Sequence, residues 1–221
     1  MTSFAQHVQR HGGHTLTAFG DSITAGASVA PDVRWATQLA AVLGLSLHNK
    51  GISGTVLQNS PDADGKPRPD NGLSRWEHDL LGSERGDYLT ILYGTNDARH
   101  TGAPDTFNLG GFVRDYRALL GGLTQAGYAP ANVCIGSPVY FPDAGFAVGD
   151  NELTGQSRDV YLRFVEAVKA LAREFGTFYA PIYESMQSQG GDTLALPDLI
   201  HPNPAGHAVI ADAFANATLI E

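Results

Sequence analysis

The chain has 221 residues, 43% of them hydrophobic, and a formal net charge of −9 from 14 Lys and Arg against 23 Asp and Glu. This length suits one domain (residues 1–221), and a folded chain of this size buries about 70% of the surface that it exposes when unfolded, enough for a core without disulfides or metal. The negative charge argues against nucleic acid or an anionic membrane as a partner, because both need a basic surface.

The sequence shows no sign of export or membrane insertion. Its first residues are polar and lack the apolar core of a signal peptide, and no apolar run approaches the roughly 18 residues of a membrane span. Cys134 is the only cysteine, so no intramolecular disulfide can form, which favours a reducing compartment. We therefore expect a cytoplasmic protein, present as a monomer or a small homo-oligomer.

Short apolar runs alternate along the chain with longer stretches whose apolar residues recur at helical spacing. The runs predict strands at residues 14–19, 45–48, 87–93, 132–136 and 177–181. The longer stretches predict helices at residues 33–43, 107–126, 157–175 and 204–217. This alternation predicts an α/β fold, a three-layer α/β/α sandwich of flavodoxin-like type with a mostly parallel five-stranded sheet.

Two long segments, residues 60–72 and 138–156, are expected to be loops that follow strands. Ligand sites in open α/β sheets lie beyond the carboxyl ends of the strands, so these loops are candidate walls of a site. The alternative is that they are tolerated surface insertions. The aromatic residues in and near them are scattered and form no continuous apolar lid: Trp76, Tyr140, Phe141 and Phe146.

The N-terminal segment, residues 1–13, is expected to be a mobile arm. Its histidines His7 and His11, with the adjoining His14, are candidate metal ligands, because residues four apart share one face of a helix. The Gly12-Gly13 pair would end such a helix, and no acidic residue or cysteine is near in the sequence. The sequence therefore predicts no metal site here.

The segment GDSIT, residues 20–24, lies where the first strand should end and a helix should begin. Backbone N–H groups and the positive end of the helix dipole would lie near the Ser22 hydroxyl. That environment stabilises negative charge, either a developing oxyanion or a bound phosphate. The plainer interpretation is an N-capping residue, for which Ser and Thr are common.

Three further short blocks lie at the ends of predicted elements. NKGISG (residues 49–54) follows the second strand, and its glycines leave backbone N–H groups open to a ligand. GTND (residues 94–97) follows the strand 87–93, and the Asn96 amide can donate to an oxyanion. DLIHP (residues 198–202) precedes the last helix, with Asp198 spaced to orient the imidazole of His201. Each block alone also suits an ordinary turn or surface position.

Together the blocks supply a nucleophile, oxyanion donors and a base with its orienting acid, which acyl transfer needs. In this order, over residues 20–202, they resemble the four blocks of the SGNH, or GDSL-type, hydrolase family. The resemblance implies Ser22 as nucleophile, Asp198 and His201 as acid and base, and the oxyanion donors Ser22, Gly54 and Asn96. It implies no metal or organic cofactor.

The expected activity is hydrolysis of short-acyl esters, chiefly acetyl esters, with an acetylated carbohydrate as one candidate substrate. Thioester or lysophospholipid cleavage remains an alternative within the family. Two non-catalytic alternatives are a flavodoxin-like module that binds phosphate and a silent relative that binds carbohydrate. Thr24 stands where a Gly-x-Ser-x-Gly elbow has its second glycine, which argues against the ordinary α/β-hydrolase arrangement.

Four other residues are predicted to have structural roles. Cys134 lies in a predicted strand, where a buried and inert thiol is expected. His207 lies on the last predicted helix and is expected to support the fold. Asp21 and Asp97 adjoin the candidate catalytic residues and are expected to accept hydrogen bonds from loop backbone.

Overall fold

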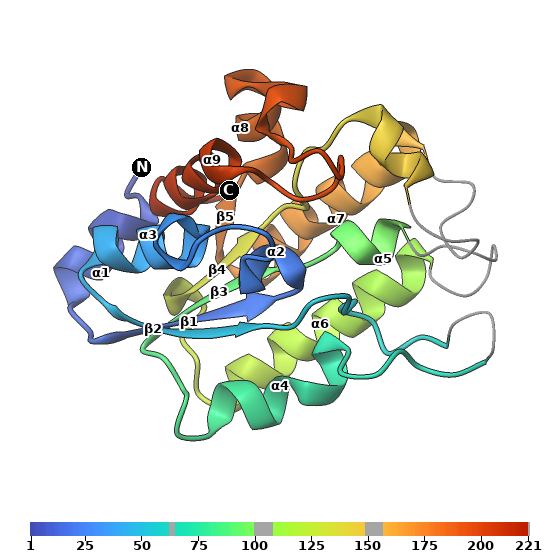
Figure 1. The fold of residues 1–221 in the computed structure, drawn as a ribbon. Coiled ribbons are helices and arrows are strands. Elements are labelled where there is room, and N and C mark those ends of the chain that lie inside the picture. Colours follow the sequence, from blue (N-terminus) through green and yellow to red (C-terminus); the bar gives the residue numbers. More distant parts are fainter. Residues whose placement is uncertain (62–64, 100–107, 149–156, 221) are drawn as a thin grey trace.

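The computed structural model describes residues 1–61, 65–99, 108–148 and 157–220, and it shows a sheet with helices on both faces (Figure 1). Within these residues the sheet has six strands in the spatial order β2-β1-β3-β4-β5-β6. The strands are β1 (Thr15–Gly20), β2 (Ser46–Gly51), β3 (Tyr88–Leu92), β4 (Val133–Gly136), β5 (Phe178–Ala180) and β6 (Thr218–Leu219). Strands β1 to β5 are mutually parallel, whereas β6 runs antiparallel to β5.

The predicted α/β sandwich with a mostly parallel sheet is confirmed, but the predicted number of five strands is wrong. The additional strand, β6, pairs Leu219 with Phe178 and Thr218 with Tyr179. It contains only two residues. A strand this short has no alternating pattern, so hydrophobic periodicity cannot detect it.

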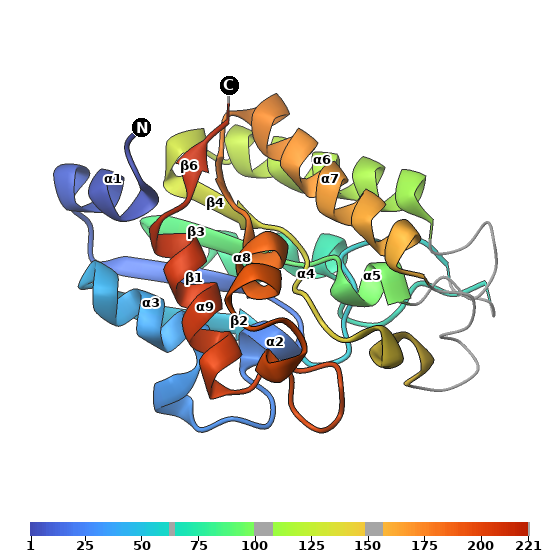
Figure 2. The same cartoon turned by 90° about the horizontal axis from the view of Figure 1, so that it is seen from above.

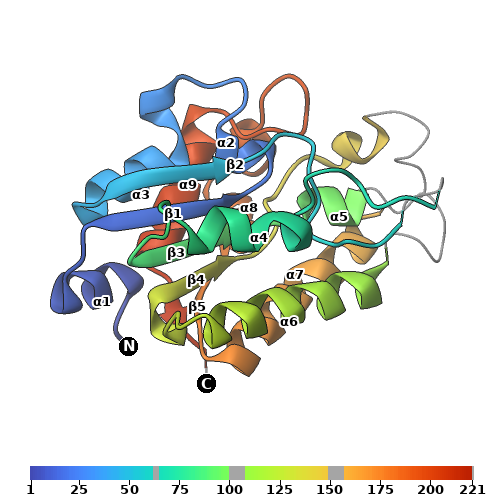
Figure 3. The ribbon, with the colours of Figure 1, turned by 90° about the horizontal axis from the view of Figure 1, so that it is seen from below.

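The helices form two layers around the sheet. One layer, over the sheet in Figure 2, contains α1 (Phe4–His11), α3 (Trp35–Leu43), α8 (Ile182–Gln189) and α9 (Pro204–Ala215). The other contains α4 (Gly72–Leu81), α6 (Leu109–Gln125) and α7 (Arg158–Phe175), and Figure 3 shows α4 and α6 over the opposite face. Strand β3 supplies both cores: Tyr88 and Leu92 pack on the first side, Leu89 and Ile91 on the second. Its unbroken apolar sequence follows from this double burial.

The N-terminal arm predicted for residues 1–13 is wrong, because Phe4–His11 form helix α1 on the sheet. The Ser3 hydroxyl accepts the Gln6 N–H while the Gln6 side chain accepts the Ser3 N–H, a reciprocal cap. Phe4 and Val8, one turn apart, are 0% and 2% exposed. The Phe4 N–H also donates to the Ala217 carbonyl at 2.8 Å, which joins the two ends of the chain.

We predict that Phe4→Ala lowers the free energy of unfolding by about 3–5 kcal/mol, the usual cost of removing a buried phenylalanine side chain. The ring lies edge-on to Tyr88, with centroids 5.9 Å apart, and packs on Phe178 at 5.3 Å. Urea unfolding measures the change. Val42→Ala, at a position 62% exposed on α3, is the control and should cost less than about 1 kcal/mol. If Phe4→Ala lowers the free energy of unfolding as little as the control does, the N-terminal segment is a mobile arm and not a packed helix.

The predicted loop 60–72 agrees with the structure in its described residues up to Asn71, whose side chain caps helix α4 at its first residue, Gly72. Residues 62–64 of this segment lie outside the described residues. Trp76 lies on α4 and not in a loop, and it packs so closely on α6 that a Cβ at Gly122 would approach its ring to 2.6 Å. Trp76 is therefore a packing residue between two helices rather than part of a site wall.

The strand order places a crevice at one end of the sheet. The chain leaves β1 toward β2 on one side, whereas β3 lies on the other side of β1. Ligands in such sheets bind beyond the carboxyl ends of the strands where the order reverses. Two short helices, α2 (Ser22–Ala25) and α5 (Thr95–Arg99), begin there, just after β1 and β3. Among the described residues, no helix combines the length and the apolar character needed to cross a membrane.

Candidate active site

Ser22 is the first residue of α2 and lies directly beyond the end of β1. The Asp21 side chain caps the helix by accepting the Ile23 N–H at 2.9 Å. The turn is tight, since a Cβ at Gly20 would lie 2.1 Å from the Thr24 Oγ1 atom. The helix expected to begin here is present, and it has only four residues. The turn, more than a long helix, fixes the position of the serine.

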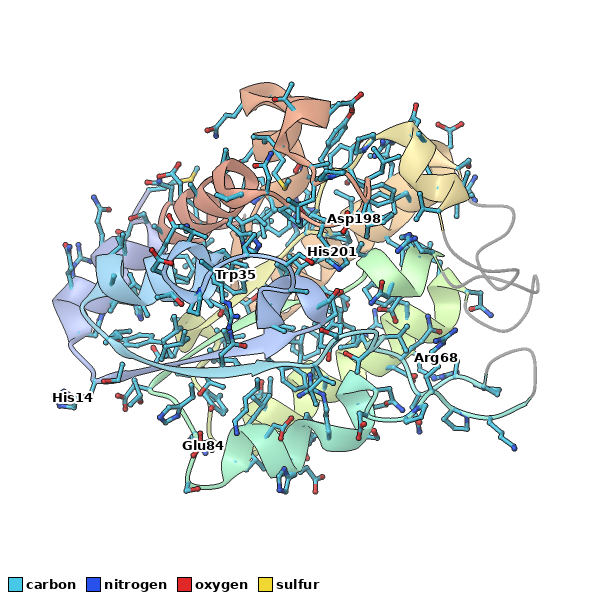
Figure 4. The ribbon with its side chains drawn as sticks, viewed as in Figure 1. His14, Trp35, Arg68, Glu84, Asp198 and His201 are labelled. Atoms are coloured by element: carbon cyan, nitrogen blue, oxygen red, sulfur yellow. The ribbon has the colours of Figure 1, made fainter. Side chains whose placement is uncertain are left out.

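A row of hydrogen bonds leads from Ser22 through His201 to Asp198. The Ser22 Oγ atom lies 2.9 Å from His201 Nε2, and His201 Nδ1 lies 2.8 Å from Asp198 Oδ2. Figure 4 shows Asp198 and His201 next to each other at the end of the molecule where α2 and α5 lie. Because Nδ1–H donates to the carboxylate, Nε2 is left as the acceptor that faces the hydroxyl.

The other carboxylate oxygen of Asp198 holds the loop that carries both residues. Asp198 Oδ1 accepts the N–H groups of Ile200 and His201, both at 2.9 Å. Burial acts to raise the pKa of Asp198, but these backbone donors and the imidazole outweigh it and hold the pKa below its usual value. Leu199 between them has a φ of 64°, a left-handed conformation that costs a non-glycine residue energy. Hydrogen bonds between Leu199 and Leu196, and between Leu196 and His201, keep the loop closed.

Gly54 and Asn96 line the same cleft as Ser22. Gly54 has a φ of 79°, which favours glycine, and it lies in the loop after β2. Asn96, on α5, is 7% exposed, and one N–H of its amide donates to the Thr55 carbonyl at 2.9 Å. That bond fixes which end of the amide carries the nitrogen and leaves the second N–H for a ligand. Ser22, Gly54, Asn96, Asp198 and His201 all line one cleft of about 410 Å³.

Asp97 and Asp21 are structural, as predicted, because both accept backbone N–H groups. Asp97 is fully buried and accepts the N–H groups of Leu57 and Gln58 at 2.9–3.1 Å. These bonds hold the loop after Gly54 against the helix that carries Asn96. Burial raises the pKa of Asp97 to about 6 and that of Asp21 to about 7, and the backbone donors only partly oppose it.

A buried polar network behind the cleft was not foreseen from the sequence. Arg75 on α4 donates to the Gly20 carbonyl at 2.9 Å and to the Tyr93 hydroxyl at 2.6 Å. The Tyr93 hydroxyl lies 3.1 Å from Thr55 Oγ1, and the Thr55 carbonyl accepts from Asn96. One guanidinium therefore supports the turn before Ser22 and, through two further residues, the Asn96 amide. A polar residue inside an amphipathic helix is the only sequence signal for Arg75.

The remaining candidates lie away from the reacting groups. His207 is 1% exposed and its Nδ1 accepts the Trp35 N–H at 3.1 Å, and burial lowers its pKa to about 4. Cys134 is fully buried, which raises the pKa of its thiol. His7 contacts Asn132 and stacks on His11. Within the described residues, no group of three or more histidine, cysteine or acidic side chains could hold a metal.

In the described part of the segment 138–156, residues 138–148, the aromatic residues pack in the core and do not line the cleft. Tyr140, Phe141 and Phe146 gather around the Arg158 guanidinium, whose carbon lies 4.7–5.6 Å from their ring centroids. These rings fill the core between the loop and α7. Of the described part of this segment, Val148 lines the cleft. Residues 149–156 lie outside the described residues.

Comparison with known proteins agrees with the geometry. The model of the GDSL-like lipase/acylhydrolase family matches residues 18–209. An acetylxylan esterase of Geobacillus stearothermophilus is 25% identical over 178 residues, which cover 78% of this chain and 71% of that protein. The crystal structure of a lipase/acylhydrolase from Enterococcus faecalis aligns with a TM-score of 0.68 at 18% identity, over 94% of this chain and 99% of that one. A variant of an acetyl xylan esterase from Geobacillus stearothermophilus aligns with a TM-score of 0.66 at 23% identity, over 91% and 93%.

Proposed function

The chain belongs to the GDSL-like lipase/acylhydrolase family, and from that premise we propose that it is a serine esterase that hydrolyses short-acyl esters, chiefly acetyl esters. The observation that carries the proposal is the row of hydrogen bonds Ser22–His201–Asp198 at 2.9 and 2.8 Å, at the mouth of a cleft. A nucleophile, a base and an orienting acid in this geometry suit acyl transfer.

In the proposed mechanism the Ser22 Oγ atom attacks the ester carbonyl carbon while His201 Nε2 takes the hydroxyl proton. The carbonyl oxygen becomes an oxyanion. It accepts hydrogen bonds from the backbone N–H groups of Ser22 and Gly54 and from the side-chain amide of Asn96. When the bond to the alcohol breaks, His201 returns the proton to the leaving oxygen. His201 then takes a proton from water, the hydroxide attacks the acyl-enzyme, and the acid leaves as Ser22 regains its proton.

The acetyl preference draws on the similarity to an acetylxylan esterase and on the cleft itself. At 25% identity the likeness supports an acetylated carbohydrate as the first substrate to test, with thioesters and lysophospholipids as alternatives. Initial rates on p-nitrophenyl esters, acyl thioesters, lysophospholipids and acetylated xylose test the proposal directly. Activity on the thioester alone would reject the proposal that the protein is an esterase.

The phosphate-binding alternative has less support. It needs a helix N-terminus with open N–H groups and a helix dipole after β1. Helix α2 has four residues, and its Ile23 N–H is already taken by the Asp21 side chain. The Asp198–His201 pair, which lies within hydrogen-bond reach of Ser22, has no role in such a module.

We predict that Asn96→Ala lowers kcat by about 10²–10³-fold with little change in KM, because the amide contacts charge that develops only in the transition state. Steady-state kinetics on p-nitrophenyl acetate measure both constants. Thermal unfolding should accompany them, since Asn96 also donates to the Thr55 carbonyl. An unchanged kcat would remove Asn96 from the oxyanion hole.

We also predict that kcat/KM is highest for acetyl to butyryl esters and falls by octanoyl. Each additional methylene group of the acyl chain contributes at most about 0.8 kcal/mol to binding when it is buried, and only where it packs on apolar protein surface. Among the described residues, the aliphatic side chains that line the cleft are those of Ala27, Val148 and Ile200, and no phenylalanine, tyrosine or tryptophan ring lines it. A p-nitrophenyl ester series gives the profile. A steady rise in kcat/KM through the long chains, or a jump in rate above the micellar concentration, would show a lipase.

A further inference from the structure

Arg99 is a buried cation in the wall of the cleft. Only 7% of it is exposed, and it is the one lysine or arginine among the described residues that line the cleft. Its Nη2 donates to the Val148 carbonyl at 2.7 Å, and its Nε is buried and has no hydrogen-bond partner among the described residues. In the part of the chain that the structure describes, no carboxylate lies within ion-pair distance of the guanidinium.

A guanidinium in this position retains unused hydrogen-bonding capacity. Most of its N–H donors have no partner among the described residues. Burial lowers the pKa of Arg99, and the nearby Tyr161, Asp198 and Asp21 act against that change. Asp198 is already bonded to His201, and Asp21 to the Ile23 N–H. Burying a charge without a close counter-charge is costly, and an anionic ligand would remove that cost.

The location of Arg99 connects it to the reacting groups. Arg99 lies on α5 three residues after Asn96, and side chains at this spacing lie on one face of a helix. Both residues line the same cleft as Ser22 and His201. An anion at Arg99 would therefore lie a few bonds from an ester carbonyl at Asn96, within the same substrate molecule.

We propose that Arg99 binds a carboxylate group carried by the ester substrate, and so selects anionic esters over neutral ones of the same shape. The inference rests on the proposed esterase function and names the class of its substrate. The net charge of −9 repels anions at long range, so a preference for a carboxylate cannot come from the general field of the protein. It would have to come from a local cation.

Matched pairs of substrates test this on the wild type. For a carboxylate on the alcohol side, p-acetoxybenzoate is compared with its neutral methyl ester. For a carboxylate on the acyl side, mono-p-nitrophenyl glutarate is compared with the neutral ester in which an isopropyl group replaces the carboxylate. After subtraction of spontaneous hydrolysis, kcat/KM should favour the anionic member of one pair. A wild type that favours the neutral member of both pairs overturns the inference.

Variants then assign the preference to Arg99. In Arg99→Gln, kcat/KM for the preferred anionic ester should fall by about 10- to 100-fold, the usual range for loss of a charged hydrogen bond, and that for its neutral partner by less than about threefold. Arg99→Lys keeps the charge and should retain part of the preference. Arg117→Gln removes an equal charge from the exposed pair with Glu174 and should leave both rates unchanged.

The outcomes separate the possible roles of Arg99. Equal losses on the anionic and neutral esters in both Arg99 variants would mean that the guanidinium serves the oxyanion or the fold, and would overturn the inference. A preference that survives Arg99→Gln would do the same. Full activity in Ser22→Ala would instead reject the proposed function itself, whatever Arg99 does.

Discussion

Ser22→Ala is expected to lower kcat for p-nitrophenyl acetate by roughly 10⁵- to 10⁶-fold, the size of loss found when a serine nucleophile is removed. The hydroxyl oxygen forms the acyl bond, and nothing else in the row of hydrogen bonds can replace it. The fold should remain, because helix α2 is capped by Asp21 and the Ser22 hydroxyl is paired with His201. Losing one such hydrogen bond costs about 1 kcal/mol. Stopped assays at high enzyme concentration, with thermal unfolding, measure both effects.

A neighbouring serine provides the control. Ser53 lines the same cleft, is exposed, and lies outside the row of hydrogen bonds. Ser53→Ala should keep activity within a few-fold of the wild type. A serine-directed fluorophosphonate should label the wild type and Ser53→Ala once each and leave Ser22→Ala unlabelled. Labelling at Ser53 would mean that the nucleophile has been misassigned.

The strands and long helices could be predicted from the sequence because each has a strong hydrophobic period. The run at residues 87–93 is mostly apolar, and the structure places β3 at Tyr88–Leu92 between two cores. The helix predicted for residues 157–175 agrees with α7 at Arg158–Phe175, where Ser157 is the N-cap. These elements bury apolar side chains that recur with the period of the element, so their sequence pattern and their burial agree.

The short elements could not be predicted this way. Helices α2 and α5 have four and five residues, and β6 has two, so each is too short for its hydrophobic pattern to repeat. Helix α1 was missed because its burial depends on only two side chains, Phe4 and Val8, among polar neighbours. Its reciprocal cap between Ser3 and Gln6 is a local signal that was available.

The residues of the candidate site could be predicted from the sequence because they lie in short sequence blocks. Ser22 and Asn96 follow predicted strands and His201 precedes the last predicted helix, and the fold brings all three into one cleft. The contacts that support the site could not be predicted from the sequence, because Arg75, Tyr93 and Thr55 are distant in the sequence and meet only in the folded structure. Arg99 could be predicted only in part. Its spacing of three residues from Asn96 places both side chains on one face only if residues 95–99 are helical, which the structure shows.

Asp198→Asn is expected to lower kcat by roughly 10⁴-fold, because the substituted side chain fixes the wrong tautomer of His201. Asp198 Oδ1 accepts two backbone N–H groups, and an asparagine oxygen can keep both. The amide NH₂ then replaces Oδ2, which lies 2.8 Å from His201 Nδ1, and donates to that nitrogen. The imidazole proton moves to Nε2, which faces Ser22 and can no longer accept the hydroxyl proton. Steady-state kinetics on p-nitrophenyl acetate measure the loss.

The same substitution should also change how stability depends on pH. Hydrogen bonds hold the pKa of Asp198 below its usual value, against the effect of burial. The ionised carboxylate therefore stabilises the fold at neutral pH, and this stabilisation is lost as the pH falls through the lowered pKa. Asp198→Asn should therefore lose less stability than the wild type between neutral pH and strong acid. Asp192→Asn is the matched control, because Asp192 accepts the Tyr140 hydroxyl at 2.8 Å outside the row of hydrogen bonds, and its kcat should stay near the wild-type value. If Asp192→Asn reduces kcat as much as Asp198→Asn does, Asp198 is not the residue that orients His201.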